Sequence, residues 1–277
     1  MRCGLIVSDP AALPAASRAL RAAGAEAAPE RLIALGADPA ANRAMLDAAL
    51  DDLDGRRLIL ALDRAHLVAL LQRLLRRGDL LTVETAVLSP LCASLVAQGM
   101  PTELAAAARL AVHGAARPVG LIRDDSGQLM VDSARLTPWR DPTSIPPPAQ
   151  PPSRLRPGYV AISPLARQSL WARAYVDDEP LCDGDIRRLT VTRVAPDRLR
   201  AEVEAPPGAR LAGGRSGRGR LGLGRRRAVE GRALQLACDE ALIVSDGISR
   251  ERPRSKRIWW AEPTFWRVAM PTPGQAP

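Results

Sequence analysis

Apolar residues in the first 115 positions alternate between strand-like runs and helical stripes. Short apolar runs of strand length occupy residues 4–8, 31–36, 56–62 and 80–89. Apolar residues recur with helical spacing over residues 11–23, 39–53, 63–77 and 103–113. Strands that alternate with helices of this length are typical of a parallel sheet covered by helices on both faces. The pattern therefore predicts a doubly wound α/β lobe at the N-terminus.

Turn and capping residues mark where these predicted helices begin and end. Each helical stripe is followed by a glycine, at Gly24, Gly55, Gly78 and Gly114. Glycine favours the left-handed backbone that often ends a helix. Asp63 stands directly before the third stripe and Thr102 directly before the fourth, so both are predicted helix caps.

The pattern changes after residue 115. Residues 117–136 alternate apolar and polar positions around an Asp-Asp-Ser-Gly turn, which predicts a hairpin. Residues 137–158 are rich in proline and predict an extended linker. Short, turn-bounded apolar runs over residues 159–277 predict a β-sandwich lobe, interrupted by a basic Gly/Arg loop at 213–227. The division is thus a nucleotide-binding-like α/β lobe (1–136), a linker and a β-sandwich lobe.

Composition narrows the class of protein. The chain has 277 residues, of which 47% are hydrophobic and 25% charged, which are ordinary values for a globular protein. No apolar run approaches the roughly 20 residues of a membrane span, and residues 1–10 lack the long apolar core of a secretory signal. A cytoplasmic location is therefore expected. Four scattered cysteines and two histidines exclude the usual zinc sites and a disulfide framework.

Charge is distributed unevenly along the chain. Residues 1–150 hold 16 basic and 16 acidic groups, so the net charge of +9 comes entirely from residues 151–277. A basic half implies an anionic partner, such as a nucleotide, an anionic membrane surface or a nucleic acid. The arginines of the 213–227 loop have no aromatic residues between them, so a membrane surface is favoured over nucleic acid.

Three stretches resemble the diacylglycerol kinase-like lipid kinases. They are QGMPTELAAAARLAVHGAARPVGLIRDDSG (98–127), LRPGYVAISPLARQSLWARAYVDDEPL (155–181) and RALQLACDEALIVSDGISRERPRSKRIWW (232–260). They occur in the order that the family has, within an α/β lobe followed by a β-sandwich lobe. The resemblance implies transfer of a phosphoryl group from ATP, with Mg²⁺, to the hydroxyl group of a lipid.

The nucleotide motifs of that family are not kept. Its GGDGT phosphate loop corresponds to residues 61–65, which read Ala-Leu-Asp-Arg-Ala, so only Asp63 matches. Its second motif, of the form PLGTGNDFAR–LGLP, corresponds to residues 87–101, where Ser-Pro-Leu-Cys-Ala (89–93) replaces the GTGND core. A Cβ atom in place of a loop glycine blocks the close approach of a phosphate to the backbone. A degenerate member with weak or no activity is therefore predicted, with Asp63 and Arg64 as candidate cofactor-binding residues.

Each candidate residue also has a simpler interpretation. Asp63 could orient a metal or a phosphate-linked water, or could only cap its helix. Arg64 could bind an anion, and His66 could act as a base, or both could be ordinary surface residues. Residues 124–127 and 177–179 resemble acidic metal sites, although hairpin-turn chemistry explains both. The sequence assigns no catalytic residue and no metal ligand.

The C-terminal aromatic residues Trp259, Trp260, Phe265 and Trp266 suit either a membrane interface or the core of the second lobe, with the core favoured. A nonenzymatic protein that binds anionic membranes through its basic half is the alternative function. A nucleic-acid-associated protein is the less favoured one. The sequence leaves the oligomeric state open, a homodimer included.

Overall fold

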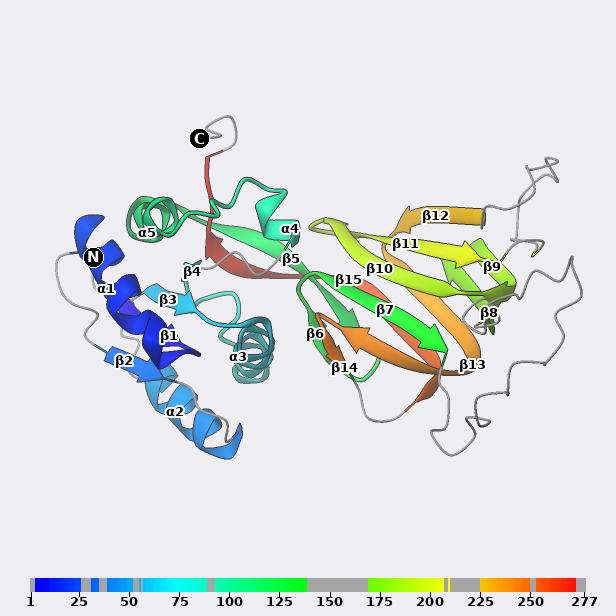
Figure 1. The fold of residues 1–277 in the computed structure, drawn as a ribbon, viewed down its shortest axis with the longest axis horizontal. Coiled ribbons are helices and arrows are strands. Elements are labelled where there is room, and N and C mark those ends of the chain that lie inside the picture. Colours follow the sequence, from blue (N-terminus) through cyan, green and yellow to red (C-terminus); the bar gives the residue numbers. More distant parts are fainter. Residues whose placement is uncertain are drawn as a thin grey trace, which may run out of the picture. The chain divides into compact units, whose positions relative to one another are not determined.

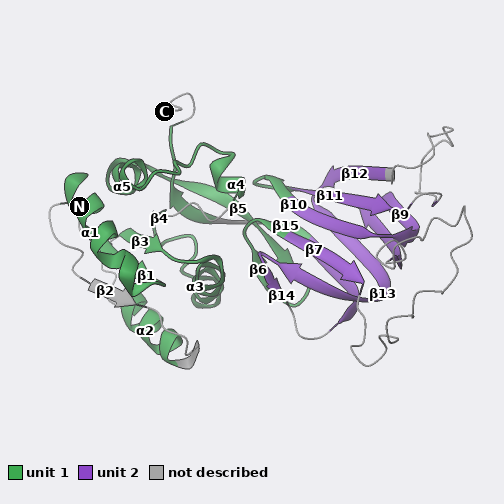
Figure 2. Ribbon diagram, viewed as in Figure 1, with its two compact units in different colours: residues 1–133, 193–198, 260–277 green, residues 134–192, 199–259 purple. Residues whose placement is uncertain are grey.

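The computed structural model describes residues 3–25, 31–34, 39–51, 55, 57–88, 93–138, 169–206, 209, 225–249 and 253–272. These residues have mixed α/β structure with a large multi-stranded sheet. The chain divides into two compact units (Figure 2). Unit 1 comprises Met1–Ser133, Arg193–Arg198 and Trp260–Pro277, and unit 2 comprises Ala134–Thr192 and Leu199–Trp259.

Unit 1 is built on parallel strands. These are β1 (Cys3–Val7), β2 (Arg31–Ala34), β3 (Arg57–Ala61) and β4 (Thr85–Val87). Their order is β2-β1-β3-β4, and Ile6 of β1 lies opposite Ile33 of β2 and Leu60 of β3. After β1 the chain therefore adds β2 on one side of β1. It then passes back over β1 and adds β3 and β4 on the other side.

Helices cover both faces of this sheet (Figure 1). The helices of unit 1 are the short 3-10 helix η1 (Pro10–Ala12), α1 (Leu13–Ala22), α2 (Pro39–Asp51), α3 (Arg64–Arg77), α4 (Ala93–Val96) and α5 (Leu104–His113). α1 and α5 share a core with Leu5 and Ile59, whereas α2 and α3 share one with Leu58 and Leu60. Alternate residues of a strand point to opposite faces, and right-handed crossovers in opposite directions place their helices on opposite faces.

Helix α3 follows its sequence signals closely. Asp63 is its N-cap, and Gly78 ends it with a φ of 78°, in the left-handed region. The predicted strand at 80–89 is shorter than expected, because the chain first makes a turn at Asp79. The carbonyl oxygen of Asp79 accepts hydrogen bonds from the backbone N–H groups of Thr82 and Val83. β4 therefore begins only at Thr85.

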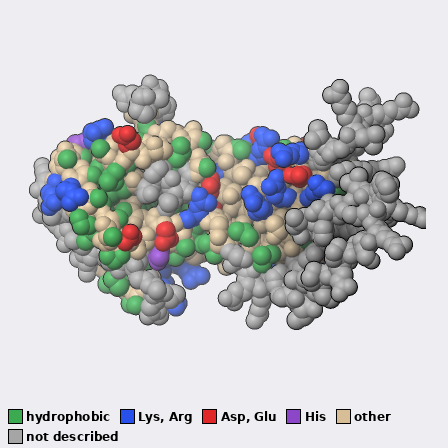
Figure 3. Space-filling model, in the orientation of Figure 1, with side chains coloured by type: hydrophobic (Ala, Val, Ile, Leu, Met, Phe, Trp, Pro, Cys, Tyr) green, Lys and Arg blue, Asp and Glu red, His purple; other side chains and the backbone are tan. Residues whose placement is uncertain are grey.

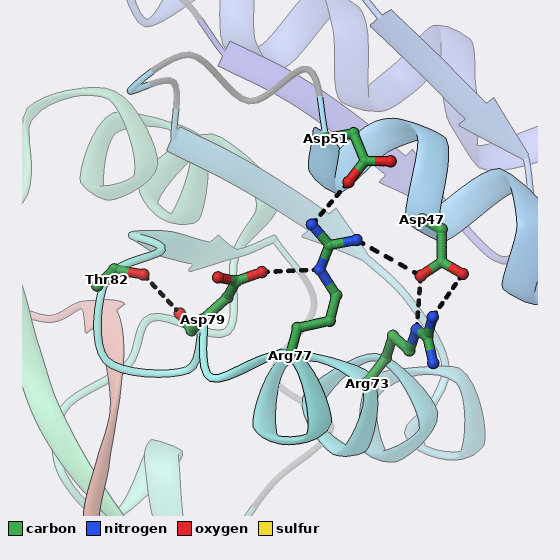
Figure 4. A network of polar contacts seen from close by, with 6 residues as sticks. All are labelled: Asp47, Asp51, Arg73, Arg77, Asp79 and Thr82. Carbon is green, nitrogen blue, oxygen red and sulfur yellow. Dashed lines mark hydrogen bonds and ion pairs between the residues drawn. The ribbon is translucent and has the colours of Figure 1, made fainter.

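An ion-pair network joins α3 to α2 (Figure 4). Arg77 donates to Asp51 at 2.7 Å and to Asp79 at 2.8 Å, and Arg73 donates to both carboxylate oxygens of Asp47. The hydrogen bond from Arg73 holds the pKa of Asp47 below its usual value. These groups are partly exposed, so the network orients the two helices more than it stabilises them.

Residues 116–138 form three strands rather than the simple hairpin that was predicted. They are β5 (Ala116–Asp124), β6 (Leu129–Met130) and β7 (Ser133–Pro138). The predicted turn is present, since β5 and β6 pair antiparallel around it. The side chain of Gln72 on α3 holds this turn, donating to the carbonyl of Gly127 and accepting from the N–H of Leu129. The rest of the second arm, β7, pairs instead with β13 of unit 2.

Unit 1 also contains two segments from the C-terminal half of the chain. The last part of β15 (Arg254–Ala269) pairs with β5 and, in parallel, with β4, where Val268 lies opposite Thr85. The buried indole N–H of Trp266 donates to the hydroxyl of Thr85 at 2.7 Å. Gly120 of β5 lies so close to Pro196 that a Cβ atom would stand 2.1 Å from its carbonyl oxygen. Only glycine fits there without moving the backbone.

The described residues of unit 2 are almost entirely strands. They are β8 (Leu170–Val176), β9 (Glu179–Ile186), β10 (Arg188–Ala195), β11 (Arg198–Ala205), β12 (Arg225–Gly231), β13 (Ala233–Ser245) and β14 (Ile248–Ser249), besides β7 and the start of β15. β9, β8 and β13 are neighbours in one antiparallel run, and β12, β11 and β10 in another. Strict alternation along β8 buries Leu170, Ala172, Ala174 and Val176.

These units differ from the continuous lobes that the sequence predicts. Residues 193–198 and 260–277, assigned to the second lobe by sequence, belong to unit 1. Trp266 accordingly lies in the core of unit 1, whereas the sequence places it in that of the second lobe. Nearly all of the predicted linker (137–158) and all but the last residues of the predicted Gly/Arg loop (213–227) lie outside the described residues.

Candidate functional site

A pocket of about 410 Å³ opens at the carboxyl edge of the parallel sheet of unit 1. It is lined by Ser8 and Asp9, which follow β1, and by Leu62 and Asp63, which follow β3. β1 and β3 are neighbours, and their following helices leave on opposite faces of the sheet. This is the topological switch point, the place where open α/β sheets bind their ligands. Both its size and its position are therefore those of a ligand site.

Asp63 is the only one of the two predicted cofactor-binding residues that lines this pocket. Its carboxylate accepts the backbone N–H of His66 at 2.9 Å and contacts the His66 ring Nδ1 at 2.7 Å. Partial burial on its own would raise the pKa of Asp63, but the hydrogen bonds from His66 outweigh it and lower that pKa. Asp63 is thus a negatively charged N-cap at neutral pH, and its side chain is still 53% exposed.

The backbone of the connection between β3 and α3 also forms hydrogen bonds with the end of β1. The N–H of Asp63 donates to the hydroxyl oxygen of Ser8 at 2.8 Å, and the N–H of Ser8 donates to the carbonyl of Ala61 at 3.1 Å. Leu62 is almost fully buried. The connection is therefore tied to the end of β1 and is short, with no glycine in it.

Arg64 points to a different part of unit 1. Its guanidinium lies 3.6 Å from the carboxylate of Asp132, which is mostly buried and also accepts the N–H of Ser94 at the start of α4. Arg64 therefore contacts the segment between β6 and β7, and it is not among the residues that line the pocket.

Sequence reasoning missed three polar residues of the pocket. Ser8 and Asp9 come directly after an apolar strand, and the carboxyl end of a strand at a switch point is a signal that could have found them. Asp9 accepts the N–H of Ala11 at 2.9 Å and so caps η1. Thr102, predicted as the N-cap of α5, lines the pocket instead, and Glu103 is the N-cap residue.

The other acidic candidates are turns. The side-chain oxygen Oδ1 of Asp124 accepts the N–H groups of Ser126 and Gln128, both at 3.0 Å, as in an Asx turn. Asp177 accepts the N–H groups of Arg232 and Ala233, at 2.6 and 2.8 Å. Within the described residues, no group of three or more His, Cys, Asp or Glu side chains could hold a metal ion.

The aromatic candidates that the structure describes are mainly core residues. Trp259 and Trp266 are 1% and 0% exposed, so neither can contact a membrane surface. Trp260 is half-buried, and the guanidinium carbon of Arg123 lies 6.0 Å from the centre of its ring. The side chain of Phe265 is outside the described part of the structure. None of the described helices combines the length and the apolar character that a membrane crossing requires.

Several basic side chains of unit 2 are paired with acidic ones. Arg188 and Glu204 are 2.7 Å apart, and Arg227 and Glu179 are 2.9 Å apart. Figure 3 shows basic and acidic side chains close together on one face of the molecule. Residues 151–277 hold 23 basic and 14 acidic residues. The described ranges contain 14 of the basic and 13 of the acidic ones, so the net charge of these described residues is +1 rather than +9. The predicted anionic partner therefore depends on residues outside the described ranges.

Comparisons with known proteins rest on structure alone. No protein-family profile and no curated protein sequence matches this chain. The fold is similar to that of a putative diacylglycerol kinase from Bacillus anthracis str. Sterne, with a TM-score of 0.65 at 12% identity over 98% of this chain and 97% of the other. It also resembles an NAD kinase from Archaeoglobus fulgidus in complex with ATP, with a TM-score of 0.52 at 10% identity over 97% and 93% of the two chains. A yeast NADH kinase aligns with a TM-score of 0.51 at 8% identity over 99% and 84%. The similarity in fold to the diacylglycerol kinase-like proteins, which the sequence motifs predict, is thereby confirmed over nearly the whole chain.

Proposed function

We propose that the protein is a degenerate diacylglycerol kinase-like protein with little or no phosphotransfer activity. It would combine a doubly wound α/β lobe with a β-sandwich lobe, and an active relative would use ATP and Mg²⁺ to phosphorylate a lipid hydroxyl. The fold similarity supports descent from such enzymes. The residues at the switch point support the loss of the reaction.

The single observation that carries the proposal is the connection between β3 and α3, which contains no glycine although it keeps Asp63 of the family's phosphate loop. A helix N-terminus binds a phosphate group through its free N–H groups and the positive end of its dipole. Here the negative carboxylate accepts the N–H of His66, and the N–H of Asp63 is bonded to Ser8. A phosphate at this helix N-terminus would have to displace these hydrogen bonds.

The backbone of this connection has an ordinary conformation, as expected for residues with a Cβ atom. Asp63 has a φ of −70°, the ordinary extended conformation of an N-cap residue. A loop that wraps a phosphate needs backbone conformations and close approaches that side chains with a Cβ atom disfavour. The described residues of the pocket therefore do not fit a polyphosphate with its Mg²⁺ ion.

We further propose a cytoplasmic protein that associates peripherally with anionic membranes. The support is the net charge of +9, which the sequence concentrates after residue 150. Each basic residue near an anionic surface contributes roughly 1 kcal/mol to association. A lipid is the ligand class that the fold similarity favours, and nucleic acid is the less favoured partner.

The test is Mg-ATP binding by calorimetry, together with phosphorylation of diacylglycerol in mixed micelles. We expect no saturable binding at millimolar Mg-ATP and no product above a blank without protein. Asp63→Asn is the matched variant, because asparagine caps helices as well as aspartate but carries no charge. Because the missing glycines rather than this charge prevent binding, the variant should bind Mg-ATP no better than the wild type does.

Two results would overturn the proposal. One is saturable binding of Mg-ATP by the wild-type protein that disappears in Asp63→Ala, since Asp63 would then serve the nucleotide. The other is phosphorylated lipid at a rate that depends on protein concentration. A ligand at 100 times its dissociation constant stabilises a fold by about 2.7 kcal/mol, so a thermal shift provides an independent readout of binding.

A further inference from the structure

We propose that the carboxylate of Asp132 is a built-in anion that blocks the binding of an external one. It contacts two groups of unit 1 that are suited to hold a phosphate, the guanidinium of Arg64 and the backbone N–H of Ser94. The contact is autoinhibitory, because a phosphate group has to compete with this carboxylate for both donors. The inference rests on the proposed function and adds a second obstacle to the missing glycines between β3 and α3.

The carboxylate of Asp132 lies where α3 and α4 begin. Its oxygen Oδ1 accepts the N–H of Ser94 at 3.0 Å, and its oxygen Oδ2 lies 3.6 Å from Nη2 of Arg64. Arg64 is the first residue of α3, and Ser94 is the second residue of α4. One carboxylate therefore bridges the beginnings of both helices, with one oxygen directed to each.

Both donors belong to segments that resemble the nucleotide motifs of the diacylglycerol kinase-like family. Arg64 takes the place of a glycine in the phosphate loop (61–65), and Ser94 lies within the second motif (87–101). Guanidinium and backbone N–H groups are donors that phosphate oxygens commonly accept in proteins. The fold thus brings two such donors together, but on a carboxylate of the chain itself.

Asp132 is anchored in this position. Its side chain is only 13% exposed, and the preceding residue, Val131, is fully buried. The hydroxyl of Ser94 donates to the carbonyl of Val131 at 3.3 Å, and the N–H of Arg193 donates to the carbonyl of Asp132 at 3.5 Å. The backbone on both sides of the carboxylate is therefore held, so the contact is a fixed part of unit 1.

Removal of the carboxylate separates this device from an ion pair that only stabilises the fold. Asp132→Ala takes one acceptor away from both donors and leaves the positive charge of Arg64 in a partly buried place. Loss of one partner of such a pair destabilises a protein. If Asp132 stands in for an anion, a small tetrahedral anion should take its place and restore the lost stability.

The experiment measures thermal unfolding of the full-length protein in sodium phosphate and in sodium chloride of equal ionic strength. Asp132→Ala should melt below the wild type in chloride. At ten times its dissociation constant, phosphate should raise the melting temperature of this variant by about 3–5 °C. The wild type should gain less than about 1 °C, because its own carboxylate already occupies the donors.

Three further variants locate the effect. Arg64→Gln, combined with Asp132→Ala, should abolish the response to phosphate. Asp132→Asn keeps an acceptor for Ser94 and removes the charge, so it should fold and show a smaller response of about 1–2 °C. Asp183→Ala is the matched control, because it removes a carboxylate that lies 2.9 Å from the guanidinium of Arg173 on an exposed part of unit 2. This control should respond to phosphate no more than the wild type does.

Several results would overturn this inference and leave the proposed function intact. They are an equal response of Asp132→Ala and the wild type, an equal response of Asp183→Ala and Asp132→Ala, and a response that survives Arg64→Gln. If Asp132→Ala folds in neither buffer, Asp132→Asn decides, and a response no larger than that of the wild type refutes the inference. Binding of Mg-ATP by the wild type would refute the proposed function, and this inference with it.

Discussion

Replacing Thr85 tests whether the C-terminal end of the chain is part of the N-terminal fold. The Thr85 hydroxyl accepts the indole N–H of Trp266 at 2.7 Å and donates to the carbonyl of Arg267 at 2.9 Å. Both Thr85 and Trp266 are 0% exposed. Thr85→Val preserves the shape of the side chain and removes both hydrogen bonds. The indole N–H then has no acceptor in a site that water does not reach.

The loss of folding stability expected for Thr85→Val follows from this burial. A buried donor that loses its acceptor costs about 1–3 kcal/mol. If the free energy of unfolding falls by about 2 kcal/mol, the melting temperature of a domain of this size falls by roughly 4–8 °C. Thr85→Ser is the matched control, because it keeps the hydroxyl and removes only a methyl group, at about 1 kcal/mol. The assay is differential scanning calorimetry of the three proteins under one condition.

A double-mutant cycle separates this bond from general damage to the core. Trp266→Phe removes the indole donor, so Thr85→Val should cost less in that background than in the wild type. We expect the double variant to be more stable than the sum of the single effects by about 1 kcal/mol. If the two effects add without coupling, or if Thr85→Val leaves the melting temperature unchanged, the placement of residues 260–270 beside β4 is wrong.

Three further predictions concern the core, the cysteines and the helix cap. A fragment of residues 1–136 should fail to fold alone, as followed by circular dichroism, because Trp266 and Val268 belong to the same core as α3; a cooperative melt of the fragment would contradict this. Burial raises the pKa of Cys182 to about 12 and that of Cys238 to about 11. At pH 8 only about one Cys182 thiol in ten thousand is then ionised, so thiol reagents should label these two cysteines only after unfolding. The pKa of Asp63 is lowered by folding, so its contribution is present above pH 4 and is lost as pH falls through the lowered value; Asp63→Ala should cost about 1 kcal/mol near pH 7 and progressively less in acid, measured by urea unfolding.

Local signals in the sequence predicted the elements around the site. The apolar periods of α1, α2, α3 and α5 were correct, because each helix buries a stripe that repeats every 3.6 residues. Asp63 and Gly78 were correctly identified as the ends of α3, since capping depends on side chains within a few residues of the helix end. The loss of the phosphate-loop glycines was likewise readable from residues 61–65 alone.

The composition of the pocket could not be read in this way. Ser8 and Asp63 are 55 residues apart in sequence, and they meet because β1 and β3 are neighbours in the sheet. Arg64 was a plausible anion ligand by position, yet it reaches Asp132 on a segment that packs beside α3 only in the folded chain. Strand order therefore decided which polar residues share the pocket.

The sequence by itself determined the mixed α/β character of the fold and the two ends of α3, because both depend on residues that are close along the chain. Tertiary structure alone decided where the C-terminal residues belong. β15 carries no local signal for its partner, and the hydrogen bond between Trp266 and Thr85 spans 181 residues. Gly120 and Pro196 show the same limit, since a backbone contact of this kind depends on how two distant segments pack. Unit 1 is thus completed by residues that the linear pattern assigns to the other half of the protein.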